Sequence, residues 1–492
     1  MYMQDRGKRM RIWRLVLGIV MITIVCAGVC SAYNPGDPEF RAIYADAWHA
    51  GYRNSSEINT LISNAHYCNA NTIVVEVRRR GDTIYQSVEP TASGFSSSFD
   101  ALADLIQKCH STSPRLDVQA WFVVWPIESD PPTSDPNHPY NRYPQYLTKT
   151  DTGATSISGD FWFDPGNPNA EQYTYNVIMD VVNRYDVDGI NFDYIRYGYN
   201  NAGYNDVSVA RFNARNGRTG QPSYGDSVWS LWRRDQVTNF VRKVYANAIA
   251  VKPNIKVTAD CIAQGGAPTN LTNFQSSAAY VNCFQNWPAW MQEGILDMDI
   301  PMTYFSCATY PGYFDNWTCF IRNYVYNRQC APVADVFSGE EGCLTSQLNV
   351  TRNSACGATN GAAIYCYSKM GSSMMNAAKA AWTTPAPIPT MPWKSLPTKG
   401  HIKGNVTFDG SVWIDGATIT LTGPNNRTMY ADGTGFFAFI DLPPGTTYTV
   451  TCTANGYGTV TTNNVHVVVG HVVDVPCDYP ISTLTISNVL AT

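Results

Sequence analysis

A short segment in the middle of the chain combines strand periodicity with polar residues on one side. In residues 189–193, Asn191 and Asp193 share one face of an extended chain, and Ile190 and Phe192 share the other. This pattern is typical of a β/α barrel, where outward residues pack beneath helices and the last inward residues reach the active-site mouth. We therefore expect Asp193 to lie at such a mouth. A structural Asp that caps the next loop is the alternative.

Seven further strand-like segments alternate with helical segments between residues 40 and 382. The eight predicted strands cover 41–48, 71–78, 116–125, 187–193, 254–260, 297–304, 329–335 and 361–367. The clearest predicted helices cover 55–70, 99–109, 169–185 and 227–251, and long loops are expected over 126–164 and 197–223. Eight such units in about 340 residues predict an α/β fold, a (β/α)8 TIM barrel over residues 39–382.

The pattern changes after the predicted barrel. Residues 383–399 are rich in proline, which disfavours helix and sheet interiors, so we expect a stiff linker. Short β-like segments separated by Gly, Asp and Asn then predict an all-β sandwich over residues 400–480. Residues 481–492 resemble the first strand of a further domain, which suggests a fragment of a longer protein. A tail that pairs with a neighbouring chain and a disordered tail are the alternatives.

The N-terminal residues 1–32 are predicted to be a cleaved signal peptide. Five basic residues precede the apolar run 15–29, which is short for a membrane span, and residues 30–32 offer a small-residue cleavage site. We therefore expect a secreted or cell-surface protein without a stable membrane span. An uncleaved anchor is the alternative.

Composition narrows the function classes. The formal net charge is −5, so the chain lacks the basic surface that nucleic-acid binding requires. Twelve of the 14 cysteines follow the predicted signal peptide, an even number that predicts disulfides, with Cys452 and Cys477 as one pair. The chain has no C-x-x-C motif and seven histidines, so we expect neither a zinc site nor another metal or cofactor.

Several motifs in the predicted barrel resemble the glycosyl-hydrolase-like family ten. They lie at 77–87, 120–122, 163–168 (Phe-Asp-Pro-Gly-Asn-Pro), 188–193 and 290–304. The resemblance implies a secreted bacterial barrel that acts on glycans. Two departures matter: Tyr194 stands where the family usually has a second acid, and Asp260 ends the fifth strand where the family commonly has none.

The predicted sandwich resembles the carboxypeptidase regulatory-like domain, which has a transthyretin-type fold. The resemblance rests on residues 404–406, 415–417, 432–436, 442–445 and 454–457. It implies an accessory domain that serves as a spacer or contacts a carbohydrate or a surface.

Glycoside hydrolysis generally needs two carboxyl groups, one protonated and one ionised, about 5 Å or roughly 6.5–9.5 Å apart. Asp193 is the candidate nucleophile or general base, and Asp260 is the candidate general acid. Glu340, on the loop after the seventh strand, is a third candidate. A salt-bridged structural role is the alternative for Asp260.

Seven residues are predicted to contact the substrate. Alternation places Glu76 on the face of Arg78, as an ion-pair partner, and Arg78 and Arg196 are expected to contact the substrate or to hold Asp193 ionised. Asp82 is expected to orient Arg78 or contact sugar, and a turn role after Gly81 is the alternative. For the aromatic candidates, core packing is the alternative to stacking on sugar. The seven candidates are Arg78, Asp82, Trp125, Asn191, Arg196, Tyr304 and Tyr367.

Two function hypotheses follow from these residues. The first is a secreted glycoside hydrolase that cleaves a polysaccharide or a cell-wall glycan with paired carboxylates. The second is a non-catalytic extracellular protein that binds glycans or assembles on a surface through its barrel, sandwich or tail. Carboxylate geometry separates the two, because only the hydrolase needs a second acid across a cleft from Asp193.

Overall fold

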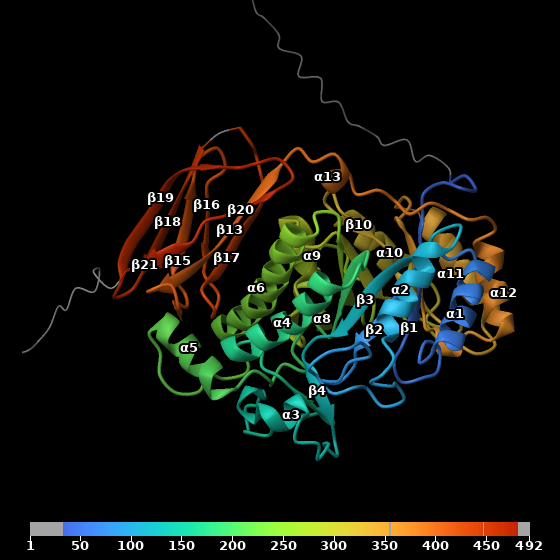
Figure 1. Ribbon diagram of the computed structural model, residues 1–492, viewed down its shortest axis with the longest axis horizontal. Helices are drawn as coiled ribbons and strands as arrows, with labels where there is room; N and C mark the ends of the chain where they lie inside the picture. The colour runs from blue at the N-terminus through green and yellow to red at the C-terminus, as the bar shows by residue number, and fades with distance from the viewer. Residues whose placement is uncertain (1–32, 354–355, 446, 481–492) are drawn as a thin grey trace, which may run out of the picture. The chain divides into compact units, whose positions relative to one another are not determined.

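The computed structural model in Figure 1 describes residues 33–353, 356–445 and 447–480. The predicted signal peptide, residues 1–32, and the C-terminal tail, residues 481–492, lie outside the described residues. Among the residues that the structure describes, no helix is both long and apolar enough to cross a membrane.

A closed barrel of parallel strands forms the larger part of the fold and confirms the (β/α)8 prediction. All eight predicted strands are present, and neighbours in the barrel pair in parallel. The last strand returns to the first, with Phe40 paired to Gly361. In order, the strands are β1 (Phe40–Ala45), β2 (Thr72–Arg78), β3 (Asp117–Val123), β7 (Gly189–Asp193), β8 (Lys256–Ile262), β9 (Met298–Met302), β10 (Gln329–Cys330) with β11 (Val333–Asp335), and β12 (Gly361–Tyr365).

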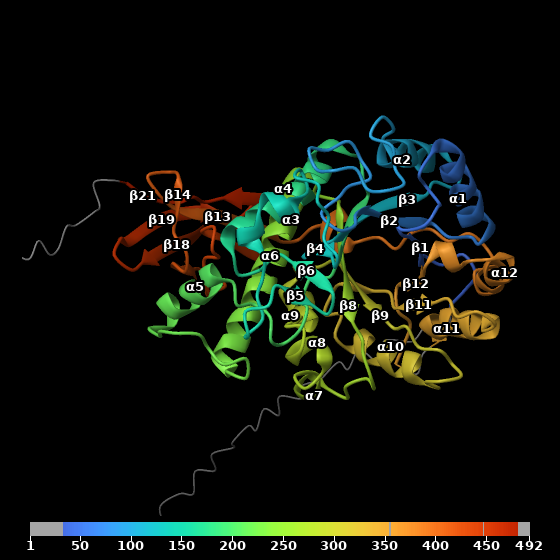
Figure 2. The ribbon, with the colours of Figure 1, turned by 90° about the horizontal axis from the view of Figure 1, so that it is seen from below.

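Helices cover the outside of these strands (Figures 1 and 2). Their buried faces pack on the outward residues of the strands, which explains the apolar outer face predicted for 189–193. The main helices are α1 (Ser55–Tyr67), α2 (Ala101–Ser111), α4 (Pro168–Arg184), α6 (Ser227–Val251), α9 (Trp287–Glu293), α10 (Tyr313–Asn323), α11 (Glu341–Asn353) and α12 (Ser372–Ala381).

The two long segments predicted as loops contain regular structure. The first holds a small antiparallel sheet of β4 (Pro126–Ser129), β5 (Ser156–Ile157) and β6 (Asp160–Trp162), with the short helix α3 (Pro139–Arg142). The second holds α5 (Asp206–Asn216), capped by the side chain of Asn205. The sequence pattern does not predict α5, because only Ser208 and Phe212 on this helix are buried and its apolar period is weak.

The inward side chains of the barrel form a separate apolar cluster. Phe40, Ala42, Val74, Met298 and Ile300 belong to it, together with Tyr44 and Trp121, which lie nearer the carboxyl ends of their strands. Polar side chains also lie inside the barrel, since Thr258 donates to Gln119 at 3.3 Å. The acidic residues Asp193 and Asp260 lie at the carboxyl-terminal end, where loops can shape a site.

The C-terminal region is an all-β structure, as predicted. One sheet contains β13 (Gly400–Phe408), β14 (Val412–Trp413), β17 (Phe436–Leu442), β20 (Val472–Asp474) and β21 (Cys477–Tyr479). The other contains β15 (Thr418–Thr422), β16 (Arg427–Tyr430), β18 (Thr447–Ala454) and β19 (Gly458–His466).

Strand β17 is apolar on both faces and packs in two directions. Phe437 and Phe439 face the core between the two sheets, whereas Phe436, Ala438 and Ile440 join the apolar cluster that also covers the outside of the barrel. Because both faces are covered, the run Phe-Phe-Ala-Phe-Ile is continuous rather than alternating.

The predicted pairing of Cys452 with Cys477 is confirmed. Two further disulfides join Cys307 to Cys343 and Cys319 to Cys356. Other cysteines of the described residues are free, and most of them are buried in the barrel, where a thiol packs as a small apolar group.

The Cys452–Cys477 disulfide gives the first testable prediction. It closes a loop with a sequence separation of 25, so its loss should destabilise the protein by about 3 kcal/mol through the greater freedom of the unfolded chain. Urea unfolding of a Cys452→Ala/Cys477→Ala variant should therefore show a lower midpoint than the wild type. Equal midpoints for the wild type and the variant, measured in the same buffer, would contradict the prediction.

Candidate active site

Two acidic side chains lie next to each other at the carboxyl-terminal end of the barrel. Asp193 is the last residue of β7, and Asp260 lies in the neighbouring strand β8. Phe192 pairs with Ala259, so the next residues along the two strands, Asp193 and Asp260, are also opposite each other. Both are buried, with 7% and 3% of their surface exposed. The sequence predicted both positions.

Two polar residues hold the carboxyl group of Asp260. The hydroxyl of Tyr44, at the far end of β1, donates to Oδ1 of Asp260 at 2.6 Å. Nδ2 of Asn191 donates both to the Tyr44 hydroxyl, at 2.8 Å, and to the same Oδ1, at 3.2 Å. Asp260 is therefore fixed by residues from two other strands. Sequence analysis did not propose Tyr44, although period two places it on the inward face with Ala42.

The surroundings raise the pKa of both acids, to different degrees. Burial raises the pKa of Asp260 well above its ordinary value, and the nearby charge of Asp193 raises it further, while hydrogen bonds from Tyr44 and Asn191 oppose the shift. Burial also raises the pKa of Asp193 overall, although Arg196 and the Tyr194 amide act to lower it. Two close carboxyl groups resist carrying two negative charges, so they titrate as a pair, and the upward shift is stronger at Asp260.

Two more acids complete the rim on the opposite strands. Burial raises the pKa of Glu76, on β2, to about 8; the amide of Ala47 opposes this shift, and the charges of Asp46 and Asp193 add to it. Although burial acts to raise the pKa of Asp46, hydrogen bonds from His49 and Ser368 lower it overall. At neutral pH Asp46 is therefore ionised and Glu76 is mostly protonated.

Aromatic rings line the space beside this cluster. Tyr304 stacks on Tyr365 with 5.1 Å between ring centres, and Trp121 lies edge-on to Tyr365 at 6.2 Å. Next to Tyr304 is an open cavity of about 490 Å³. Its lining includes Arg196, Gln264, Met302, Tyr304, Phe305 and Tyr310. A cavity with aromatic walls and a few polar groups suits a ring-shaped polar ligand such as a sugar.

Comparison with known proteins places this barrel in a family. A family model described as Glycosyl hydrolase-like 10 matches residues 39–331, more than half of the chain. The chain belongs to the glycosyl hydrolase-like 10 family. A second model, the carboxypeptidase regulatory-like domain, matches residues 401–478, the all-β region. Both matches confirm the resemblances seen in the sequence.

Curated relatives of this family member are distant. It is 23% identical over 345 residues to Glycosyl hydrolase YngK of Bacillus subtilis, covering 63% of each chain. It is 24% identical over 255 residues to Glycosyl hydrolase DigH of Escherichia coli, covering 48% of this chain and 54% of DigH. The chain thus spans less than two thirds of the length of these relatives.

One solved structure supports the fold. The glycoside hydrolase domain of PgaB (BpsB) from Bordetella bronchiseptica superposes with a TM-score of 0.53 at 10% identity. The match covers 71% of this chain and 99% of that domain. At this identity the likeness concerns the fold alone.

Tyr194, the residue after the end of β7, positions Asp193. Its backbone adopts a positive φ of 51°, a region that residues with side chains seldom occupy. In this conformation the Tyr194 amide donates to Oδ1 of Asp193 at 2.6 Å. Its ring packs on Trp162 and lies 4.1 Å from the guanidinium of Arg196, which is 3.7 Å from Asp193.

The prediction that Arg78 shares the face of Glu76 and contacts substrate is wrong. The register between β2 and β3 shifts between Glu76 and Arg78, so the alternation breaks there. Arg78 is fully buried, donates to the carbonyl oxygen of Val124 at 2.9 Å and lies over the ring of Tyr173 in α4. Burial among these groups removes it from the mouth.

Asp82, predicted to orient Arg78, instead pairs with Arg79. Nη2 of Arg79 is 2.5 Å from Asp82, and the guanidinium lies 4.2 Å from the ring of Trp48. Asp82 therefore orients Arg79. Both residues are largely buried. A direct contact between Asp82 and a sugar stays a prediction.

The aromatic candidates have different outcomes. Trp125 is fully buried and packs on Phe240 of α6 at 4.7 Å, so the prediction of a sugar platform is wrong and the alternative of core packing holds. Tyr367 is half-buried, and its hydroxyl accepts a hydrogen bond from Asn64 in α1 at 2.8 Å. A contact between Tyr367 and substrate stays a prediction.

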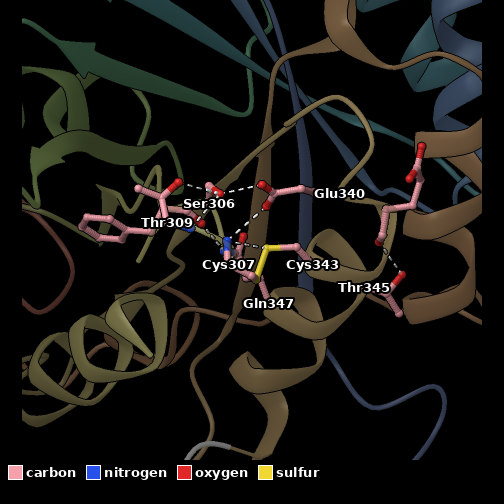
Figure 3. The surroundings of a disulfide bond; sticks show 9 residues. Ser306, Cys307, Thr309, Glu340, Cys343, Thr345 and Gln347 are labelled. Atoms are coloured by element: carbon pink, nitrogen blue, oxygen red, sulfur yellow. Dashed lines mark hydrogen bonds between the residues drawn. A yellow bond between two sulfur atoms is a disulfide. The ribbon is translucent and has the colours of Figure 1, made fainter. Parts of the chain in front are cut away.

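Glu340 has both carboxylate oxygens occupied by a neighbouring loop (Figure 3). Oε1 accepts from the Ser306 hydroxyl at 2.5 Å, and Oε2 accepts from the Cys307 amide at 3.1 Å. Together with Cys307 and Cys343 it forms a group compact enough for a metal ion. The two sulfurs are joined in a disulfide, however, and are not the thiolates that a metal binds.

The Phe-Asp-Pro-Gly-Asn-Pro motif has a structural function in this barrel. Asp164 is fully buried and accepts hydrogen bonds from Thr148, Gly166, Asn205 and Ser208. The motif thus joins the two long insertions at the start of α4. A sequence motif can therefore be specific to a family without belonging to its chemistry.

The raised pKa of Glu76 leads to a prediction about stability. Its pKa of about 8 in the folded protein lies above the ordinary value of 4.5, so folding favours the protonated form. This contribution is complete below pH 4.5 and is lost as pH rises towards 8, at up to about 1.4 kcal/mol per pH unit.

Glu76→Gln should remove this pH dependence, because a glutamine stays neutral and still accepts the Ala47 hydrogen bond. Chemical unfolding at pH 5, 6, 7 and 8 should show that the variant gains stability relative to the wild type as pH increases. A constant difference across these pH values would show that Glu76 does not titrate in this range.

Proposed function

We propose that this protein is a secreted glycoside hydrolase that cleaves a polysaccharide or a cell-wall glycan. The observation that carries the proposal is the pair Asp193 and Asp260, adjacent at a barrel mouth, with the stronger upward pKa shift at Asp260. Membership of the glycosyl hydrolase-like 10 family supports the reaction class. The disulfides and the predicted signal peptide support an extracellular location.

In this proposal Asp193 is the nucleophile or the general base. Its pKa is raised less than that of Asp260, and Arg196 and the Tyr194 amide stabilise its negative charge, so it is the member of the pair suited to act as the carboxylate. As nucleophile it would attack the anomeric carbon, and as base it would take a proton from the attacking water. In both cases its carboxylate faces the positive charge that develops on the sugar.

Asp260 is the proposed general acid. Burial raises its pKa well above the ordinary value, which suits a group that gives a proton to the oxygen of the leaving sugar. Tyr44 and Asn191 hold its carboxyl group and stabilise the carboxylate that remains after the transfer. Asn191 thus acts through Asp260, and its own contact with substrate is not needed.

The proposed sugar-binding groups surround the open cavity. Tyr304 and Arg196 line it beside the acid pair, and Phe305 and Tyr310 form its aromatic wall. Stacking on such rings is suited to the apolar faces of sugars, and the guanidinium can donate to hydroxyl groups. Both oxygens of Glu340 are engaged, so it has no part in the proposed proton transfers.

Substitution of the two acids tests the proposal. Asp193→Asn and Asp260→Asn should each reduce reducing-sugar release from a panel of purified polysaccharides by about 10²–10⁴-fold, the range of a lost acid or base. Asp335→Asn is the matched control, because Asp335 also ends a barrel strand but pairs with Lys369. It should retain activity within a few-fold of the wild type.

Equal release by the wild type and Asp193→Asn would remove Asp193 from the mechanism. Glycan binding without release by either protein would instead favour the second hypothesis, a barrel that binds glycans without cleaving them. Circular dichroism of each variant shows whether the fold is retained.

The pH profile tests the assignment of the acid. Wild-type kcat/KM should fall at alkaline pH as Asp260 loses its proton, and at acidic pH as Asp193 gains one. The residual activity of Asp260→Asn should lack the alkaline decrease. If the variant keeps the alkaline decrease, another group is the acid.

A further inference from the structure

One loop supplies most of the aromatic wall of the cavity beside the acid pair. Residues 303–312 connect β9 to α10 and carry Tyr304, Phe305 and Tyr310, which all line the cavity of about 490 Å³. The loop has no helix or strand of its own. Something outside the loop must therefore hold these rings in place.

Two contacts from the neighbouring strand–helix unit hold this loop (Figure 3). Cys307 forms a disulfide with Cys343 in the first turn of α11, with 5.7 Å between the Cα atoms. Glu340, the residue before α11, accepts hydrogen bonds from Ser306 and from the Cys307 amide. A covalent bond and a charged hydrogen-bond acceptor thus act on adjacent residues of the loop.

These contacts extend to the rings that line the cavity. Gln347 of α11 donates to the carbonyl oxygen of Phe305 at 2.6 Å. The carbonyl oxygen of Ser306 accepts from the Tyr310 amide at 2.8 Å. The rings of Phe305 and Tyr310 pack edge-on at 5.8 Å. Fixing residues 306 and 307 therefore also fixes Phe305 on one side and Tyr310 on the other.

We propose that the Cys307–Cys343 disulfide and Glu340 are positioning elements that set the affinity of this cavity for a sugar ring. The inference rests on the proposed glycosidase function. A ring that is held in place before binding loses little freedom when a sugar stacks on it, so the tether increases affinity without taking part in bond cleavage. The occupant is a saccharide unit next to the scissile bond.

The second disulfide of the barrel provides a matched control. Cys319–Cys356 has a sequence separation of 37, against 36 for Cys307–Cys343, so removing either frees the unfolded chain by a similar amount. Cys319 lies within α10, beyond the loop, and neither Cys319 nor Cys356 lines the cavity. Only Cys307–Cys343 should affect the aromatic wall.

Steady-state kinetics on the polysaccharide that the wild type cleaves provide the first test. Cys307→Ala/Cys343→Ala should raise KM about tenfold, because one aromatic contact with the sugar is no longer held in place. The kcat of this variant should stay within about twofold of the wild type. Glu340→Gln keeps one of the two side-chain oxygens that accept hydrogen bonds from the loop, so it should raise KM by a smaller factor. Cys319→Ala/Cys356→Ala should leave KM unchanged. A KM that rises equally in both double variants would overturn the inference.

Amide hydrogen exchange provides a test that needs no substrate. In Cys307→Ala/Cys343→Ala, the amides of residues 305–310 should exchange at least about tenfold faster than in the wild type and in the control double variant. Wild-type exchange rates there would overturn the inference even if the enzyme is active. A wild-type protein that cleaves no glycan counts against the proposed function instead, so the two failures are distinguishable.

Discussion

Two carboxyl groups on neighbouring strands, in a part of the barrel with little water, resist carrying two negative charges at once. Asp193 and Asp260 are in this position, and the residues around them differ accordingly. Burial is the main cause of the raised pKa of both acids, but a guanidinium and a backbone amide oppose it at Asp193, whereas the charge of Asp193 adds to it at Asp260. The two groups therefore differ in how readily they ionise. Tyr194, with its positive φ, and the inward Tyr44 each bring a donor to one of the two acids.

Alternation along the sequence was sufficient to predict the eight strands, the sandwich and the adjacency of Asp193 and Asp260. It failed where local geometry breaks the period. The bulge after Glu76 turns Arg78 away from the mouth, and nothing in the residue types of β2 marks it. Trp125 follows β3, and periodicity cannot distinguish a ring at the mouth from one under α6. Tyr44 was missed because its partner Asp260 is 216 residues away.

The outcome for Glu340 shows why a position after a barrel strand is not enough to identify a catalytic acid. A proton donor or nucleophile needs an oxygen that is free to meet the substrate and a pKa shifted by its surroundings. Asp260 is buried with one oxygen bound by Tyr44 and Asn191. Glu340 has both oxygens bound by Ser306 and Cys307. A carboxyl group therefore stabilises a loop at Glu340, whereas at Asp260 it keeps the features that the proposed acid needs.

The distribution of charge over the whole mouth suits the proposed reaction better than the acid pair does alone. Glycoside cleavage passes through a transition state with positive charge on the sugar. At neutral pH Asp46 is ionised and Glu76, with a pKa of about 8, is mostly protonated. In a buried site a negative charge such as that of Asp46 acts strongly on the developing positive charge. Glu76 lies on β2, between β1, which Asp46 follows, and β7, which ends in Asp193. As a neutral acid it adds no third negative charge there, so the carboxylate of Asp46 faces the mouth without repulsion from its neighbour on β2.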